Sequence, residues 1–208
     1  MKKGLALIAV VIIAVAVYFI IFNRQEKTTP VVKKMKPARL TISKNPQEFN
    51  TAFSGMLVSY YNLKDALVNW DSTKATQEAK TLSQLASQVP LSLLKADSNI
   101  VLTAKNLISA VVTESNDLSA SKTILEKRRS FSILSDNLYS LINTVRYDKE
   151  VIYYDMCPMA FGEDEQAYWL SRDSAISNPY LGNKHPKYHS SMINCGNVED
   201  MIDYASKQ

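Results

Sequence analysis

The chain has 208 residues, 46% of them hydrophobic and 21% charged, which suits one membrane anchor and one domain of ordinary size. The net charge of +4 is unevenly placed: residues 1–146 carry 19 Lys and Arg against 10 Asp and Glu, whereas residues 147–208 carry 5 against 10. No dense basic patch contains interleaved aromatic residues, so the sequence argues against nucleic-acid binding.

The N-terminus predicts a single-pass membrane anchor. After Lys2 and Lys3, residues 4–22 contain no charge, and as a helix they would span roughly 28 Å, close to the thickness of a bilayer core. A cleaved signal peptide is the alternative, but the bulky run Tyr18–Phe22 stands where a peptidase needs small side chains. Lys2 and Lys3 favour a cytoplasmic N-terminus, whereas five basic residues between Arg24 and Lys36 favour the opposite orientation. A short N-terminal anchor usually exports the chain that follows it, which favours the first orientation. We therefore expect the anchor in the inner membrane and the rest of the chain in the periplasm.

A basic linker and a helical region follow the anchor. Residues 23–44 contain two prolines and five lysines without apolar periodicity, which predicts a flexible tether. Asn45 is then the expected N-cap of a first helix, with Pro46 at its first position. Between this point and Val145 the chain holds one further proline and one glycine, as is typical of a nearly all-helical stretch.

Four stripes of apolar residues, spaced three and four apart, predict four amphipathic helices in residues 45–146. With short connections, they favour an up-and-down four-helix bundle. The expected stripes are Phe49, Phe53, Met56, Tyr60, Leu63, Leu67 and Trp70; then Ala75, Ala79, Leu82, Ala86 and Val89, with Asp71 as the cap; then Ile100, Ala104, Leu107 and Val111; and last Ile124, Phe131, Leu134, Leu138, Leu141 and Val145.

Residues 147–208 predict a smaller, loop-rich tail. Val151–Tyr154 and Ala167–Leu170 are strand-like runs that favour a hairpin, and Met201–Tyr204 is expected to form a last helical turn. The tail is too short to bury a core of its own, so we expect it to pack against the end of the bundle. The predicted fold is therefore mainly α: a four-helix bundle with a small C-terminal hairpin and loop tail, preceded by a transmembrane helix.

Four sulfur-containing residues of the tail form a candidate metal site. Cys157 and Met159 would point the same way on an extended strand, and Met192 and Cys195 form a second pair. Thiolate and thioether ligands select Cu(I) or Ag(I) over harder ions. A disulfide between the two cysteines is the alternative outside the cytoplasm, and unpaired thiols are a third reading.

The two histidines of the chain precede Cys195. His189 is a candidate additional ligand, and His185 with His189 and both cysteines would complete a Cys2His2 zinc set. Pro186 argues against a helix here, so the four-residue spacing carries little weight.

No catalytic motif accompanies these residues. The sequence lacks a glycine-rich phosphate loop, a Gly-x-Ser-x-Gly elbow and a His-Glu-x-x-His pair, so we expect no enzyme and no small-molecule substrate. A weak thiol-redox activity is the remaining catalytic hypothesis.

An ordered series of segments resembles a bacterial family known as domain of unknown function 3347. The series comprises Tyr154–Ala160 with its Cys-Pro-Met, Ala167–Ser171, Asn178–Gly182 and Met192–Val198 with its Met-x-x-Cys-Gly, together with Leu63–Asp71 in the helical region. The resemblance covers roughly residues 50–200.

That family occurs alone and at the C-terminus of periplasmic adaptors of copper and silver efflux pumps. The resemblance therefore implies a periplasmic accessory protein that binds Cu(I) or Ag(I), with a heavy-metal efflux complex as its partner. A non-catalytic, disulfide-stabilised module that docks on an envelope complex is the alternative.

Overall fold

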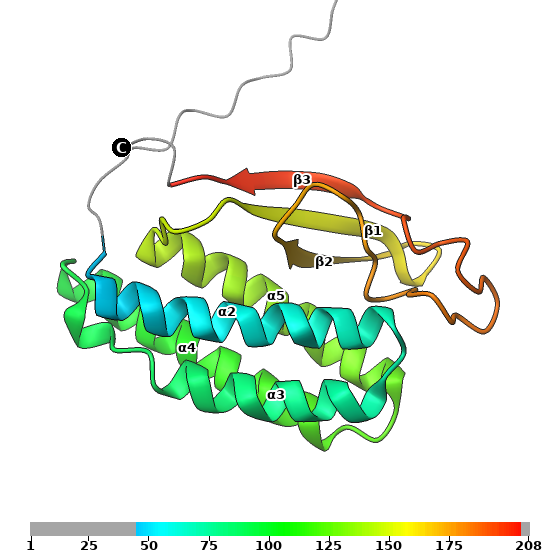
Figure 1. Cartoon of the computed structure of the whole chain (residues 1–208), viewed down its shortest axis with the longest axis horizontal. Coiled ribbons are helices and arrows are strands. Elements are labelled where there is room, and N and C mark those ends of the chain that lie inside the picture. The colour runs from blue at the N-terminus through cyan, green and yellow to red at the C-terminus, as the bar shows by residue number, and fades with distance from the viewer. Residues whose placement is uncertain (1–44, 205–208) are drawn as a thin grey trace, which may run out of the picture. The chain divides into compact units, whose positions relative to one another are not determined.

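Helices dominate the computed structural model, which describes residues 45–204 (Figure 1). The expected anchor (4–22) and linker (23–44) lie outside these residues. Among the described residues, no helix is long and apolar enough to cross a membrane. The helices are α2 (Gln47–Val68), α3 (Ser72–Ser87), the 3-10 helix η1 (Leu91–Leu93), α4 (Ser98–Ala120) and α5 (Ile124–Val145), and they pack as a four-helix bundle.

Most of the predicted apolar stripes are buried. In α2 all six helical members of the stripe are fully buried, and Trp70 lies just beyond the helix end. The stripe of α4 was partly misplaced, because Ile100 is exposed and Ile108 lies in the core instead. The buried members in α3 and α5 match the prediction from Ala75 to Ala86 and from Phe131 to Val145.

Of the two predicted helix caps, one is confirmed and one is wrong. Asp71 caps α3, as predicted, by accepting a hydrogen bond from the backbone of Lys74 at 2.9 Å. The prediction for Asn45 is wrong: Pro46 occupies the cap position of α2 and supplies no side-chain hydrogen bond. The Asn45 amide instead donates to the carbonyl of Val145 at 2.9 Å, so it ties the start of α2 to the end of α5.

The tail forms a three-stranded antiparallel sheet in the order β2-β1-β3. Strands β1 (Ile152–Gly162) and β2 (Glu165–Ser171) make the predicted hairpin. Strand β3 (Asn197–Ile202) corrects the expected helical turn, since Met201 and Ile202 pair with Tyr153 and Ile152 of β1.

The sheet packs along the bundle, beside α2 and α5, and not against its end (Figure 1). Tyr154 of β1 stacks on Tyr139 of α5 at 4.0 Å between ring centroids, and its hydroxyl donates to Asp136 at 2.6 Å. Buried residues of the sheet, including Ile152 and Leu170, belong to the same apolar core as the helices. The long side of the bundle is favoured because it offers more apolar surface than an end.

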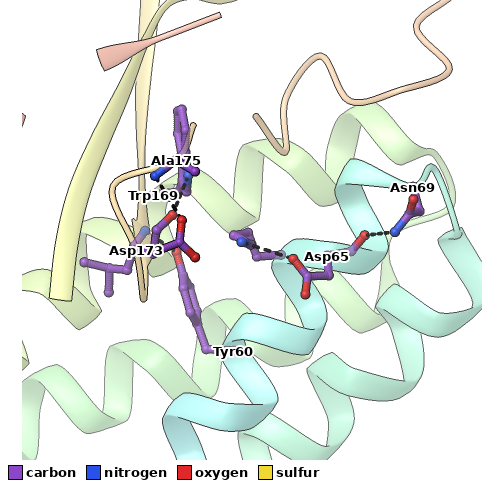
Figure 2. A network of polar contacts seen from close by, with 9 residues as sticks. Tyr60, Asp65, Asn69, Trp169, Asp173 and Ala175 are labelled. Atoms are coloured by element: carbon purple, nitrogen blue, oxygen red, sulfur yellow. Dashed lines mark hydrogen bonds and ion pairs between the residues drawn. The ribbon is translucent and has the colours of Figure 1, made fainter. Parts of the chain in front are cut away.

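Two tyrosine hydroxyls close the outer edge of β2. Tyr60 rises from α2, and its hydroxyl accepts a hydrogen bond from the backbone N–H of Leu170 at 3.0 Å (Figure 2). The hydroxyl of Tyr180 donates to the carbonyl of Tyr168. An edge strand otherwise presents unpaired backbone groups, and these side chains satisfy two of them.

Candidate thiol and methionine site

The structure brings the two cysteines together. Cys157 lies on the central strand β1 and is fully buried, whereas Cys195 precedes β3 and is half-buried. Their side chains are within hydrogen-bonding reach of each other, and both thiols are free. The two thiols therefore lie close together, although 38 positions separate them in sequence.

A glycine allows this approach. Gly196 has a φ of +138°, and a Cβ at this position would lie 2.6 Å from the carbonyl oxygen of Met156. Only glycine fits such a conformation and so close a contact with the neighbouring strand. The segment that carries Cys195 can therefore lie directly against β1.

Asn178 holds the covering loop in place. Its side-chain amide donates to the carbonyl of Cys195 at 2.7 Å, and its side-chain oxygen accepts from the backbone of Tyr180 and Leu181. Its backbone N–H donates to Ile193 at 2.8 Å. Asn178 is fully buried, and its side chain also lowers the pKa of the Cys157 thiol. It therefore holds the segment of Cys195 directly and lies close to Cys157.

Burial sets the protonation of the buried thiol. Desolvation raises the pKa of Cys157 above its ordinary value, and hydrogen bonds from Asn178 and from the backbone of Met159 offset part of that rise. The group is therefore a neutral thiol at pH 7, which makes it a poor nucleophile. A metal ion would have to displace its proton.

The other predicted ligands differ in their surroundings. Met159 and Met192 are both partly buried and pack against the apolar core. His189 is exposed on a turn with a φ of +52°, where its backbone pairs with that of His185. Among residues 45–204, no three His, Cys, Asp or Glu side chains form a group that could hold a metal ion, so the zinc set of two cysteines and two histidines is not assembled.

His185 forms hydrogen bonds within its own loop. Its Nδ1 accepts hydrogen bonds from the backbone N–H groups of Lys187 and Tyr188, both at 3.2 Å. Two donors at Nδ1 place the ring proton on Nε2. Burial, together with the charges of Arg128 and Lys187, lowers the pKa of His185. The ring is thus neutral and presents an N–H donor rather than a metal ligand.

A buried carboxylate lies on the same strand and was not singled out from the sequence. Asp155 is fully buried, and neither oxygen has a hydrogen-bond partner of good geometry among the described residues. Burial raises its pKa to about 6, and Ser171 and Lys64 offset part of the effect. The sequence does indicate Asp155, because an acidic residue inside a strand-like aromatic run is unusual.

Figure 2 shows polar contacts of α2, of β2 and of the loop after β2, and two of their residues, Ser171 and Lys64, lower the pKa of Asp155. The indole N–H of Trp169 donates to the Ser171 hydroxyl at 3.1 Å, and Lys64 pairs with Asp65 at 3.1 Å. Trp169 is the cross-strand partner of Asp155, so it covers the same face of the sheet.

A family model matches part of the chain. The chain matches no curated protein and no solved structure. The tail segments around Cys157 and Cys195 lie beyond the residues that the family model matches. Residues 56–150 match the model described as "Protein of unknown function (DUF3347)", and this match confirms the resemblance to that family over these residues.

Proposed function

We propose that the chain is a membrane-anchored periplasmic accessory protein that binds Cu(I) or Ag(I) in heavy-metal efflux or resistance. One observation carries the proposal: Cys157 and Cys195 lie close together as free thiols, and Asn178 holds the segment of Cys195. Two converging thiolates form a soft ligand pair that suits a monovalent soft ion.

The methionines extend this ligand pair. Met159 follows Cys157 by two positions on β1, and Met192 accepts a backbone hydrogen bond from Cys195 at 3.0 Å. Each cysteine therefore has a thioether close to it in the chain, and both thioethers line the apolar core. Thioethers add soft ligands without adding charge, so the site would remain selective against Zn²⁺. His189 is a weaker candidate because it is solvated on its turn.

The same geometry favours a second candidate, a non-catalytic module stabilised by a disulfide that docks on an envelope complex. Two thiols in contact outside the cytoplasm are open to oxidation. Closing a loop of about 39 residues would stabilise the fold by up to ~4 kcal/mol on the chain-entropy estimate. The disulfide would then be the oxidised form of the same two cysteines that bind a metal ion when they are reduced.

An anaerobic titration tests the metal proposal. The full-length chain, reduced and solubilised, is titrated with Cu(I) in competition with a chromogenic chelator. We expect one ion per chain, and we expect Cys157→Ser and Cys195→Ser each to abolish competitive binding.

A matched pair of methionine variants tests the thioether. Met159→Leu should weaken Cu(I) binding, whereas Met201→Leu should leave it unchanged, because Met201 is exposed on β3. The proposal fails if the reduced wild type does not compete with the chelator. A 157–195 disulfide that resists mild reductant would then establish the structural alternative.

A further inference from the structure

A cavity of about 520 Å³ is lined by neither cysteine, although Met159 lies in its wall, and its volume is typical of a site for a small ligand. It is bounded by the residue after α2, the start of α5, the tip of the β1–β2 hairpin and the loop 180–188. Its walls are mainly apolar and include four aromatic side chains, namely Trp70, Phe161, Tyr180 and Tyr188.

A buried guanidinium lines this cavity. Arg128 is 3% exposed, and its Nε and Nη2 donate to the carbonyls of Pro179 and Leu67 at 2.8 and 3.0 Å. Its guanidinium also lies 4.0 Å from the ring centroid of Trp70. Burial lowers the pKa of Arg128 to about 10, and no carboxylate contributes to that value.

The partners of Arg128 neutralise only part of its charge. Leu67 lies in the last turn of α2, where the helix dipole supplies roughly half a negative charge. Neutral carbonyls and an aromatic face cannot supply the remainder. A full positive charge at an apolar wall is costly unless an anion accompanies it.

One further charge and one neutral hydrogen-bond donor also line the cavity. Lys187 lines the cavity, and its ammonium lies 5.0 Å from the ring centroid of Tyr188. His185, also in the lining, carries its ring proton on Nε2. Glu163, at the exposed hairpin tip, is the one acidic residue among those lining the cavity. The electrostatic balance of the cavity is therefore positive.

We propose that this cavity binds a small organic anion, a carboxylate carried on a flat, apolar body. The aromatic walls match the flat body, and Lys187, His185 and Arg128 provide charge and hydrogen-bond donors for the carboxylate. The ligand is bound and not transformed, and the inference does not depend on the cysteines or on metal binding.

A pair of isosteric probes tests the proposal by isothermal titration calorimetry on the metal-free, full-length chain. 2-Naphthoate carries the carboxylate, and 2-naphthamide has the same body without the charge. We expect 2-naphthoate to bind with one site per chain and at least about tenfold more tightly than the amide, the difference of one charge-assisted contact.

Surface variants locate the binding without disturbing the core. Leu125 lines the cavity and is 52% exposed, so Leu125→Trp should fill the space and abolish binding. Leu102→Trp is the matched control on the exposed face of α4, at 57% exposure, and should bind as wild type does. Lys187→Gln should reduce the preference for the anion over the amide. Equal affinity for the two probes, absence of saturable binding, or binding that survives Leu125→Trp would each overturn the proposal.

Discussion

At the residue scale, Asp155 makes the stability of the fold depend on pH. Its carboxyl has a folded pKa of about 6, above its ordinary value, because it is buried without good hydrogen-bond partners. Between pH 4 and 6 the folded state therefore binds more protons than the unfolded state, so stability falls as pH rises through this window. The expected loss by pH 7 is about 3 kcal/mol, since one pKa unit corresponds to about 1.4 kcal/mol.

Replacing the carboxyl of Asp155 should remove this dependence of stability on pH. Asp155→Asn keeps the shape but cannot ionise, so its unfolding free energy, measured by urea denaturation from pH 4 to 7, should change less with pH than that of the wild type. Asp164→Asn, on the exposed turn between β1 and β2, is the matched control and should keep the wild-type profile. Parallel curves for the wild type and Asp155→Asn would show that Asp155 is ionised in the folded state at no cost.

The two thiols should differ in reactivity. Cys157 is fully buried and its pKa is raised, whereas Cys195 is partly exposed. Alkylation proceeds through the thiolate, so iodoacetamide should label Cys195 of the reduced chain well before Cys157. Peptide mass spectrometry over a time course measures the order. Equal rates would mean that the loop 172–196 opens faster than the reagent attacks.

At the scale of elements, α5 offers a direct test of which helix face is buried. Leu134 is fully buried in the core, and its neighbour Ile133 is 51% exposed on the same helix. Leu134→Ala should lower the unfolding free energy by about 2–5 kcal/mol, because it leaves a cavity. Ile133→Ala is the control at the adjacent position and should cost well under half as much. A similar loss of unfolding free energy in both variants would mean that Leu134 is not on the buried face of α5.

The edge of β2 depends on the hydroxyl of Tyr60. Tyr60→Phe keeps the ring but leaves the buried N–H of Leu170 without its acceptor, which should cost about 1–3 kcal/mol. Hydrogen exchange at the Leu170 amide should accelerate in this variant. Tyr153→Phe, at a partly buried position of β1, should change neither quantity. An unchanged exchange rate in Tyr60→Phe would show that the hydrogen bond does not protect the strand.

Elements with a strong local period were predictable, and those set by tertiary pairing were not. Helices α2 and α5 each contain 22 residues, so many apolar residues agree on which face of the helix is buried. Strand β3 has only 6 residues, and the spacing of its apolar residues does not distinguish a strand from a helical turn. Its state follows from pairing with β1, and that pairing cannot be read from six residues.

At the scale of the whole molecule, ligand chemistry led to Cys157 and Cys195 as candidate ligands, but the sequence did not indicate which contacts hold their segments. The side chain of Asn178 donates to the carbonyl of Cys195, 17 positions further along the chain. Arg128 interrupts an otherwise apolar helix face, and its partners lie on α2 and on the loop after β2. Contacts between distant segments depend on the assembled fold, so local sequence cannot specify them.

The arrangement of the whole chain in the cell is a prediction that concerns residues outside 45–204. The uncharged run 4–22 should remain in the mature protein as an anchor, because the bulky residues that end it are poor substrates for a signal peptidase. Mass spectrometry of the membrane-extracted protein should then find the original N-terminus. Protease added to intact spheroplasts should digest the domain if it faces the periplasm, and a cytoplasmic marker protein should survive as the control. A mature N-terminus near residue 25 would show cleavage, and protection of the domain until the spheroplasts are lysed would reverse the orientation.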